Sequence, residues 1–262
     1  MADHSDLFVE LVRDGQVATV TVNRPAKLNS LTPAMLDQLE RCARELDADT
    51  DVRVVILTGG GERAFCVGAD INEWAALQPL DMWRRWVRRG HQVFDQWARL
   101  RQPVITAING HAFGGGLELA ITGDIRIAAE RAQFALPEAS IATCPGWSGT
   151  QRLVQLIGAS RAKYLALSGM RVSAADALTC GLVHEVVAAD TLQARAMALA
   201  QDMATKAPVS LQLTKQLINA AAGEDAAATL EAMAGALAAT TTDATEGIRS
   251  FQEKRAARYL GA

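Results

Sequence analysis

The sequence predicts a mixed α/β protein, because strand and helix patterns alternate along most of the chain and helical patterns alone follow. Short apolar runs of the kind that form buried strands end in glycine-containing loops, and each loop leads toward a helix. Two such strand-loop-helix segments are expected to be successive coils of one spiral. From about residue 190 the strand patterns stop, and alanine-rich helical stretches replace them. We therefore expect a spiral α/β core followed by a helical region.

The first elements are expected to be a β-hairpin and a capped helix. Residues 7–12 and 17–23 alternate in polarity on either side of an Asp-Gly pair, which is a hairpin signal. Thr32 can cap a helix whose first residue is Pro33. The apolar residues that continue this helix are Met35, Leu36, Leu39 and Leu46. Buried strands are then expected at residues 52–58, 104–109 and 123–129.

The most informative segment, residues 111–120, places three glycines at a strand-to-helix turn and Glu118 just inside the helix. Glycine lets the backbone approach a ligand closely, and the first amides of a helix lack partners within it. Such amides can stabilise a developing oxyanion beside a carboxylate that exchanges a proton. Taken alone, the pattern fits equally well a glycine-containing turn that only packs under a helix.

A second carboxylate, Glu138, favours a catalytic interpretation. The strand expected at residues 123–129 brings the chain back beside its start, so that Glu118 and Glu138 can face one cavity. Two carboxylates in one site do not both ionise freely, so one can donate a proton while the other accepts one. Each glutamate considered singly would more often be a solvated surface residue. The pair predicts general acid/base chemistry.

The chain as a whole resembles the crotonase (enoyl-CoA hydratase/isomerase) superfamily. The matching segments follow the family's order over nearly the whole chain, which makes the resemblance far more specific than any single glycine motif. These segments are Asn23–Leu31, Ala64–Ile71, His111–Ala120, Phe134–Glu138, Pro145-Gly146 with Gly149–Leu153, and Glu246-Gly247 with Phe251–Arg255.

The resemblance implies a fold and an assembly. It implies a crotonase-like spiral of repeated β-β-α units over residues 1–189, which would hold the acyl-CoA and catalytic site. It also implies a C-terminal α-helical oligomerisation region over residues 190–262, through which family members form trimers that often pair into hexamers. Helices poor in large apolar residues seldom form a core alone, which agrees with packing on the core or on neighbouring subunits.

The resemblance also assigns site residues. Ala69 and Gly115 match the two oxyanion-hole positions, whose backbone amides hold the thioester oxygen of an acyl-CoA. Glu118 and Glu138 match the two catalytic carboxylates of a hydratase, and Gly146 matches the position whose amide helps to seat the attacking water. The positions that match the family's coenzyme A contacts are Ala26, Lys27, Leu28, Val67, Asp70 and Ile71.

The implied activity is that of an enoyl-CoA hydratase, which adds water to a 2-enoyl-CoA and needs no metal or redox cofactor, since coenzyme A is part of the substrate. The resemblance alone makes Glu138 the proton donor to C2. One alternative is an enoyl-CoA isomerase that uses Glu138 to move a proton along the acyl chain. Another is a non-catalytic oligomer that binds coenzyme A or RNA. The first helix carries Asp37, Glu40, Glu45 and Asp47, whereas the RNA-binding branch of the family has a lysine-rich helix there.

Composition argues against several other classes of protein. The net charge of −3 gives no general attraction to nucleic acid. No apolar stretch of about 18 residues and no charged-then-apolar leader is present, so we expect no membrane span and a cytoplasmic location. The four histidines are too scattered for a metal site. The cysteines, which show no paired spacing and are expected to be reduced and mostly buried, are Cys42, Cys66, Cys144 and Cys180.

Two segments depart from the family's pattern. Trp147 and Ser148 follow the Pro-Gly pair, where many relatives have small residues. An indole there is expected either to narrow the acyl pocket or to shield the site enough to favour movement of a proton over hydration. The segment Trp83–Arg89 mixes tryptophan with arginine, and we expect a solvated helix face with its tryptophans turned inward. Neither segment identifies the acyl group of the substrate.

Overall fold

The computed structural model describes residues 7–262. The chain forms two compact units, Met1–Gln212 and Leu213–Ala262. The boundary lies after the expected one at residue 190, because helix α8 (Leu192–Ala204) packs on the large sheet of the first unit. Within the described residues, none of the helices is both long and apolar enough to cross a membrane.

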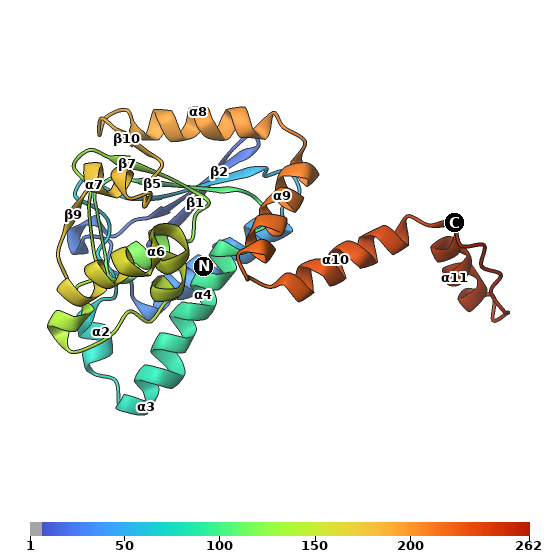
Figure 1. Cartoon of the computed structure of the whole chain (residues 1–262), viewed down its shortest axis with the longest axis horizontal. Helices are drawn as coiled ribbons and strands as arrows, with labels where there is room; N and C mark the ends of the chain where they lie inside the picture. The colour runs from blue at the N-terminus through green and yellow to red at the C-terminus, as the bar shows by residue number, and fades with distance from the viewer. Residues whose placement is uncertain (1–6) are drawn as a thin grey trace. The chain divides into compact units, whose positions relative to one another are not determined.

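The first unit is built around a six-stranded sheet (Figure 1). Strands β1 and β2 form the expected antiparallel hairpin, and the other neighbours pair in parallel. Several of the expected strands begin two residues later than the apolar runs suggested. In sheet order the strands are β1 (Val9–Asp14), β2 (Val17–Val22), β3 (Val54–Gly59), β5 (Val104–Ile108), β7 (Ile125–Ala129) and β10 (Glu185–Val187).

A second, four-stranded sheet completes the expected spiral. Each coil contributes one strand to the large sheet, the next strand to the small sheet, and then a helix, as in β3-β4-α2 and β5-β6-α5. The predicted fold class is therefore confirmed. The strands of the small sheet are β4 (Ala64–Cys66), β6 (His111–Phe113), β8 (Gln133–Ala135) and β9 (Val172–Ser173).

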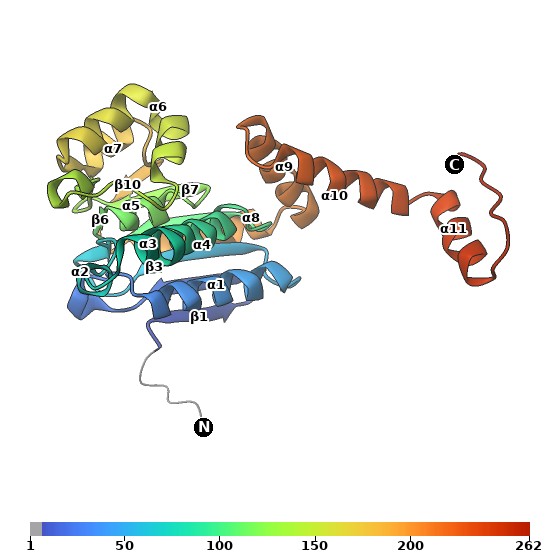
Figure 2. The same cartoon turned by 90° about the horizontal axis from the view of Figure 1, so that it is seen from below.

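The two faces of the large sheet bury different helices, because successive side chains of a strand point to opposite faces. In β3, Val54 and Ile56 pack against α8, whereas Val55 and Leu57 belong to the larger core on the other side. Figure 1 shows α8 along one side of the sheet and α4 and α6 on the opposite side. Figure 2 shows α1 and α4, which pack against each other within that larger core.

Several helices begin at residues whose side chains cap them. The side chain of Thr32 accepts a hydrogen bond from the amide of Met35, as expected, and Ser173 caps α7 in the same way. A backbone break at Gly158 interrupts α6. The helices of the first unit other than α8 are η2 (Pro25–Lys27), α1 (Pro33–Ala48), α2 (Ile71–Ala75), α3 (Pro79–Asp81), η3 (Met82–Val87), α4 (Arg88–Ala98), α5 (Gly115–Ala120), η4 (Glu138–Ile141), α6 (Gly149–Ser168) and α7 (Ala174–Thr179).

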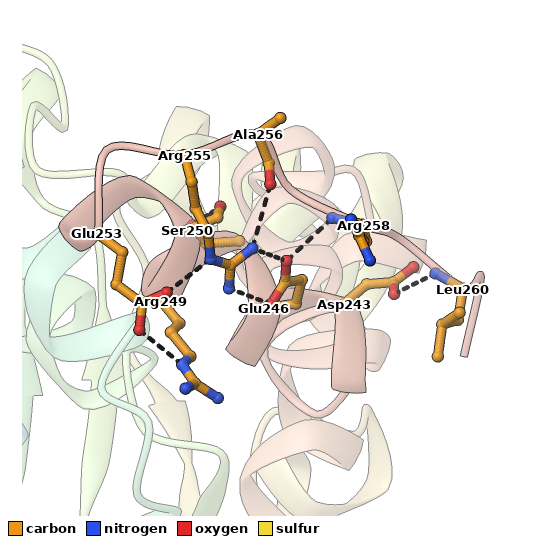
Figure 3. Close-up of polar contacts among 10 residues, drawn as sticks. Asp243, Glu246, Arg249, Ser250, Glu253, Arg255, Ala256, Arg258 and Leu260 are labelled. Carbon is orange, nitrogen blue, oxygen red and sulfur yellow. Dashed lines mark hydrogen bonds and ion pairs between the residues drawn. The ribbon is translucent and has the colours of Figure 1, made fainter.

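Helix α9 (Pro208–Ala221) spans the boundary, and the second unit continues with α10 (Ala226–Ala239) and α11 (Thr242–Gln252). Breaks near residues 208 and 223 separate α8, α9 and α10. Around α11, the Arg255 guanidinium contacts Glu246 with Nη2 to Oε2 at 2.9 Å, and it contacts Glu253 with Nε to Oε2 at 2.6 Å (Figure 3). These family-matched residues therefore hold the end of the chain against its last helix.

Two sequence expectations about individual side chains were wrong. Trp86 is buried as expected, but Trp83 is 61% exposed, because only one of the two indoles faces the core from the irregular π-helical turn η3. Cys144 is exposed, and Cys180 is half-buried, so the four free thiols are not mostly buried. Cys144 lies in the loop after η4, which also lines the cavity described next.

Candidate active site

A cavity of about 230 Å³ lies where the segments that follow β4, β6 and β8 meet. Because these three strands are neighbours in the small sheet, the spiral brings together residues that are far apart in the sequence. The sequence-predicted site residues that line the cavity are Val67, Ala69, Ile71, Gly115, Glu118, Glu138 and Gly146.

Ala69 and Gly115 are placed to present backbone amides to this cavity. The amide of Leu31 donates to the carbonyl of Gly68 at 2.8 Å, and the carbonyl of Leu31 accepts from the amide of Asp70 at 2.8 Å. Since bonding directions alternate along extended backbone, the amide of Ala69 points away from Leu31. Gly115 is the first residue of α5, so its amide has no acceptor within the helix.

The glycine run allows two coils to approach each other closely. Gly114 has φ of +53°, and a Cβ there would lie 2.8 Å from Oε1 of Glu138. A Cβ on Gly116 would lie 1.9 Å from the carbonyl oxygen of Cys66 in β4. Any larger residue would separate the coils that carry the amides and the second carboxylate.

Glu118 is held by the backbone of a loop that lies about 30 residues later in the sequence. Its Oε1 accepts hydrogen bonds from the amides of Trp147 and Gly149, both at 2.8 Å. The side chain is 3% exposed, and burial raises the pKa of Glu118 to about 7. The two amides oppose that rise, while the charge of nearby Glu138 adds to it. Glu118 can therefore change protonation state near neutral pH.

Glu138 has a different environment. It is the first residue of η4 and is only half-buried, with its carboxylate against Gly114. Its Oε2 is buried and has no hydrogen-bond partner among the described residues. Burial raises the pKa of Glu138 as well. An uncharged, protonated Glu138 would offer a proton to a molecule in the cavity.

Trp147 forms an apolar wall of the cavity and is 3% exposed. A Cβ on Gly115 would lie 2.7 Å from the indole, and a Cβ on Gly90 of α4 would lie 2.1 Å from its Nε1. The ring also packs against Trp86 and Phe94, with centroids 5.3 and 5.2 Å away. The absence of side chains at the two glycines thus makes room for the indole.

Much of the remaining wall was not anticipated from the sequence. Met82 and Trp86 are four residues apart, and this helical spacing was the one available signal that both face the same side. The wall residues that the sequence analysis did not identify are Trp74, Met82, Trp86, Val87 and Ile141.

Ala26, Lys27 and Leu28, three of the predicted coenzyme A contacts, lie in or just after η2, outside the lining of the cavity. Ala26 and Lys27 are exposed. The carbonyl of Leu28 accepts a hydrogen bond from the amide of Val67 at 3.2 Å. This bond places the segment beside Val67, which directly follows β4 and lines the cavity. The exposed segment therefore borders the cavity wall.

Asp70 also lies outside the cavity lining, and its side chain is engaged within the protein. Its Oδ2 contacts Nη1 of Arg24 at 2.7 Å, and its Oδ1 accepts from the amide of Asn72 to cap α2. The Arg24 guanidinium lowers the pKa of Asp70. The carboxylate thus joins the segment that contains η2 to the start of α2.

The arrangement of two amides and two carboxylates around one apolar cavity agrees with comparisons to known proteins. The family model described as enoyl-CoA hydratase/isomerase matches residues 13–261. The chain belongs to this family. The short-chain-enoyl-CoA hydratase of Clostridium acetobutylicum is 39% identical over 249 residues, which cover 94% of this chain and 95% of the relative. The mitochondrial enoyl-CoA hydratase of Pongo abelii is 37% identical and covers 94% and 84%.

Solved structures of the family also resemble the chain. The crystal structure of an enoyl-CoA hydratase from Bacillus anthracis has a TM-score of 0.81 at 38% identity and covers 97% of this chain and 100% of that one. A structure of DspI from Pseudomonas aeruginosa has a TM-score of 0.82 at 33% identity and covers 99% of both chains. The spiral core of the enoyl-CoA hydratase/isomerase family is therefore preserved here.

Proposed function

We propose that the chain is an enoyl-CoA hydratase that adds water across the double bond of a 2-enoyl-CoA thioester. The observation that carries the proposal is the placement of Glu118 and Glu138 in the same cavity as Ala69 and Gly115. Addition of water needs charge stabilisation on the thioester oxygen, a base for the water and an acid for the adjacent carbon. The near-full-length similarity to curated enoyl-CoA hydratases supports the same activity.

In this proposal, the amides of Ala69 and Gly115 hold the thioester oxygen. Water loses a proton to ionised Glu118, and its oxygen forms a bond with C3. The π electrons of the C2–C3 bond move toward the thioester, and the resulting enolate charge rests on the oxygen between the two amides. Protonated Glu138 then supplies the proton to C2, which gives a 3-hydroxyacyl-CoA. Gly146, whose amide faces Glu118, helps to seat the water.

Burial raises the pKa of both glutamates, so each can hold a proton closer to neutral pH than an exposed glutamate does. Burial brings the pKa of Glu118 to about 7, so a large fraction is ionised at neutral pH. Its Oε1 is engaged by two amides, which leaves the other oxygen for water. The buried, unpartnered Oε2 of Glu138 suits a group that exchanges a proton with a bound molecule, and its assignment as the donor to C2 follows the resemblance. The charge of one glutamate opposes ionisation of the other, which favours one shared proton.

The substrate contacts follow from the same geometry. Among the described residues, the charged side chains in the lining are the two glutamates, so we propose an apolar acyl group. We propose that coenzyme A is contacted, mainly through the backbone, by the segment with Ala26, Lys27 and Leu28 and by Val67, Asp70 and Ile71, which lie between the end of β4 and the first residue of α2.

We also propose a homotrimer, with or without pairing into a hexamer, formed through the C-terminal helices. Large apolar side chains on these helices are exposed in the single chain, as expected of a surface that another subunit covers. They include Leu217, Ile218, Leu230, Leu237, Ile248 and Phe251. We also propose a cytoplasmic location, where the free, exposed thiol of Cys144 would stay reduced, and a role in fatty acid metabolism, which the similarity to enoyl-CoA hydratases supports.

The test replaces each glutamate by glutamine, which keeps the shape but removes proton exchange. Both Glu118→Gln and Glu138→Gln should lower hydration of crotonyl-CoA by at least about 100-fold, measured as loss of enoyl absorbance. Glu130→Gln, at an exposed position, is the matched control. Hydration that survives Glu118→Gln within a few-fold would rule out the two-carboxylate mechanism.

The same variants separate the hydratase from an isomerase. Movement of a double bond needs one base, whereas hydration needs a held water as well. An unmodified chain that is inactive on 2-enoyl-CoA thioesters, and a Glu118→Gln variant that still isomerises a 3-enoyl-CoA, would assign the isomerase reaction to Glu138.

A further inference from the structure

The loop that holds Glu118, residues 146–149, is itself anchored to helix α4 by a polar cluster. We propose that Asp95 is a positioning residue for Glu118, which acts through Ser148 and Arg152 without touching the substrate. This proposal rests on the role of Glu118 in the proposed function.

 

Asp95 and His91 lie one turn apart on α4 and face the loop together. Oδ1 of Asp95 accepts from Nη2 of Arg152 at 2.9 Å and from the hydroxyl of Ser148 at 3.3 Å. The Ser148 hydroxyl also lies 3.2 Å from Nδ1 of His91. Ser148 and Arg152 are 4% and 7% exposed, so these contacts are largely shielded from water. Asp95 thus ties both ends of the first turn of α6 to α4.

The loop needs such an anchor because its backbone is strained where it turns toward Glu118. Ser148 has φ of +77°, in the left-handed region that residues other than glycine adopt only when their surroundings enforce it. Next to it, a Cβ on Gly149 would lie 2.5 Å from Cγ of Glu118. Trp147 and Gly149, on either side of Ser148, donate the two hydrogen bonds to Glu118. Fixing Ser148 therefore fixes both donors.

The titratable and charged groups around Asp95 and Ser148 come from α4 and α6. His91, Asp95 and Arg99 come from α4, with Arg99 Nη2 3.9 Å from Oδ2 of Asp95, and Arg152 comes from α6. Glu138 is the titratable side chain that acts on Glu118 itself. Because the two amides favour the ionised form of Glu118, loosening the loop should raise the pKa of Glu118.

The first test compares Asp95→Ala with Asp95→Asn, which keeps an acceptor oxygen for Ser148 and Arg152. Asp95→Ala should lower kcat on crotonyl-CoA by about 10-fold, leave KM within about threefold, and move the acid limb of the kcat-pH profile to higher pH. Asp95→Asn should restore most of kcat and the original profile. Arg89→Ala, which removes the ion pairs of another α4 residue to Asp37 and Glu40 on α1, is the matched control.

A lowered kcat with a nearly unchanged KM and a shifted kcat-pH profile would support the positioning role. An unshifted kcat-pH profile in Asp95→Ala would overturn it. If Asp95→Ala does not fold, Ser148→Ala removes only the hydroxyl and should shift the profile in the same direction. An unchanged profile in that folded variant would equally overturn the proposal.

A second measurement does not depend on hydration. Glu118→Gln is introduced into the unmodified chain and into Asp95→Ala, and the free energy of unfolding is measured at about pH 8. We expect the effects of the two substitutions to be coupled. Glu118→Gln should raise the free energy of unfolding more in Asp95→Ala than in the unmodified chain, because the ionised Glu118 carboxylate has lost its anchored hydrogen-bond donors there. Additive effects would overturn the positioning role. Coupling in a chain that hydrates no enoyl-CoA would support the positioning role while refuting the proposed function.

Discussion

Replacing Glu118 by glutamine should abolish activity and yet stabilise the protein at alkaline pH. The native fold buries a carboxyl group that prefers to remain protonated, and burial raises its pKa from 4.5 to about 7. That difference corresponds to about 3 kcal/mol of free energy of unfolding. The native state binds the proton more tightly than the unfolded chain does. The contribution of protonated Glu118 to the free energy of unfolding is therefore fully present below about pH 4.5 and is lost as the pH rises to about 7.

Glutamine has no proton to lose in this range, and its Oε1 can still accept from the amides of Trp147 and Gly149. The difference in free energy of unfolding between Glu118→Gln and the unmodified chain should therefore increase by up to about 3 kcal/mol between about pH 5 and about pH 8. The assay is urea unfolding followed by circular dichroism at both pH values, at one fixed protein concentration.

Glu185→Gln provides a control of opposite sign. The Arg195 guanidinium, with Nη2 to Oε1 at 2.6 Å, lowers the pKa of Glu185. Its contribution is present above the unfolded pKa and is lost only at more acidic pH, so between about pH 5 and about pH 8 its stability difference should change only through the charge of neighbouring His184. A pH-independent difference for Glu118→Gln would refute the reasoning, because it would mean that burial does not hold the proton on Glu118.

Three further predictions concern the oxyanion hole, the pocket and the assembly. Gly115→Pro removes a backbone amide of the proposed oxyanion hole and should lower turnover by at least about 100-fold, with circular dichroism and oligomer mass as controls. Near-normal turnover in a folded variant would contradict the assignment of Gly115. Trp147→Gly should raise activity on longer enoyl chains relative to crotonyl-CoA, and an unchanged chain-length profile would leave the indole a packing role. Deleting residues 226–262 should yield monomers or aggregates in light scattering, whereas a soluble truncated trimer would exclude the tail from assembly.

The large sheet could be predicted because its strands are long enough to show a pattern. The apolar run at residues 104–109 is a buried strand, and the polarity alternation at residues 17–23 marks the hairpin. The small sheet was not predictable in this way. Strands such as β6 (His111–Phe113) have three residues, which is too short for a period of two to be recognised. The spiral was visible only from the repetition of strand, loop and helix.

The residues at the cavity could be found where chemistry leaves a local signature. A glycine run before Glu118 and a second carboxylate at Glu138 are such signatures. The contact of Asp95 with Ser148 joins residues 53 apart in sequence, and no pattern within either helix indicates it. The exposure of Trp83 was missed for a related reason, since an irregular helical turn decides which indole faces inward.

The spiral explains how residues as far apart in the sequence as Ala69 and Glu138 come to line one cavity. Ala69, Gly115 and Glu138 each follow a strand of the small sheet, and these strands are neighbours. Each coil therefore delivers one functional group to the same edge, and changes of length elsewhere in a coil would leave that edge intact. The spacing between each small-sheet strand and its functional residue has no such freedom, because a shift of one residue would turn an amide away or move a carboxylate out of reach. The constraint on function thus lies in three short segments, while the large sheet and its helices hold those segments in register.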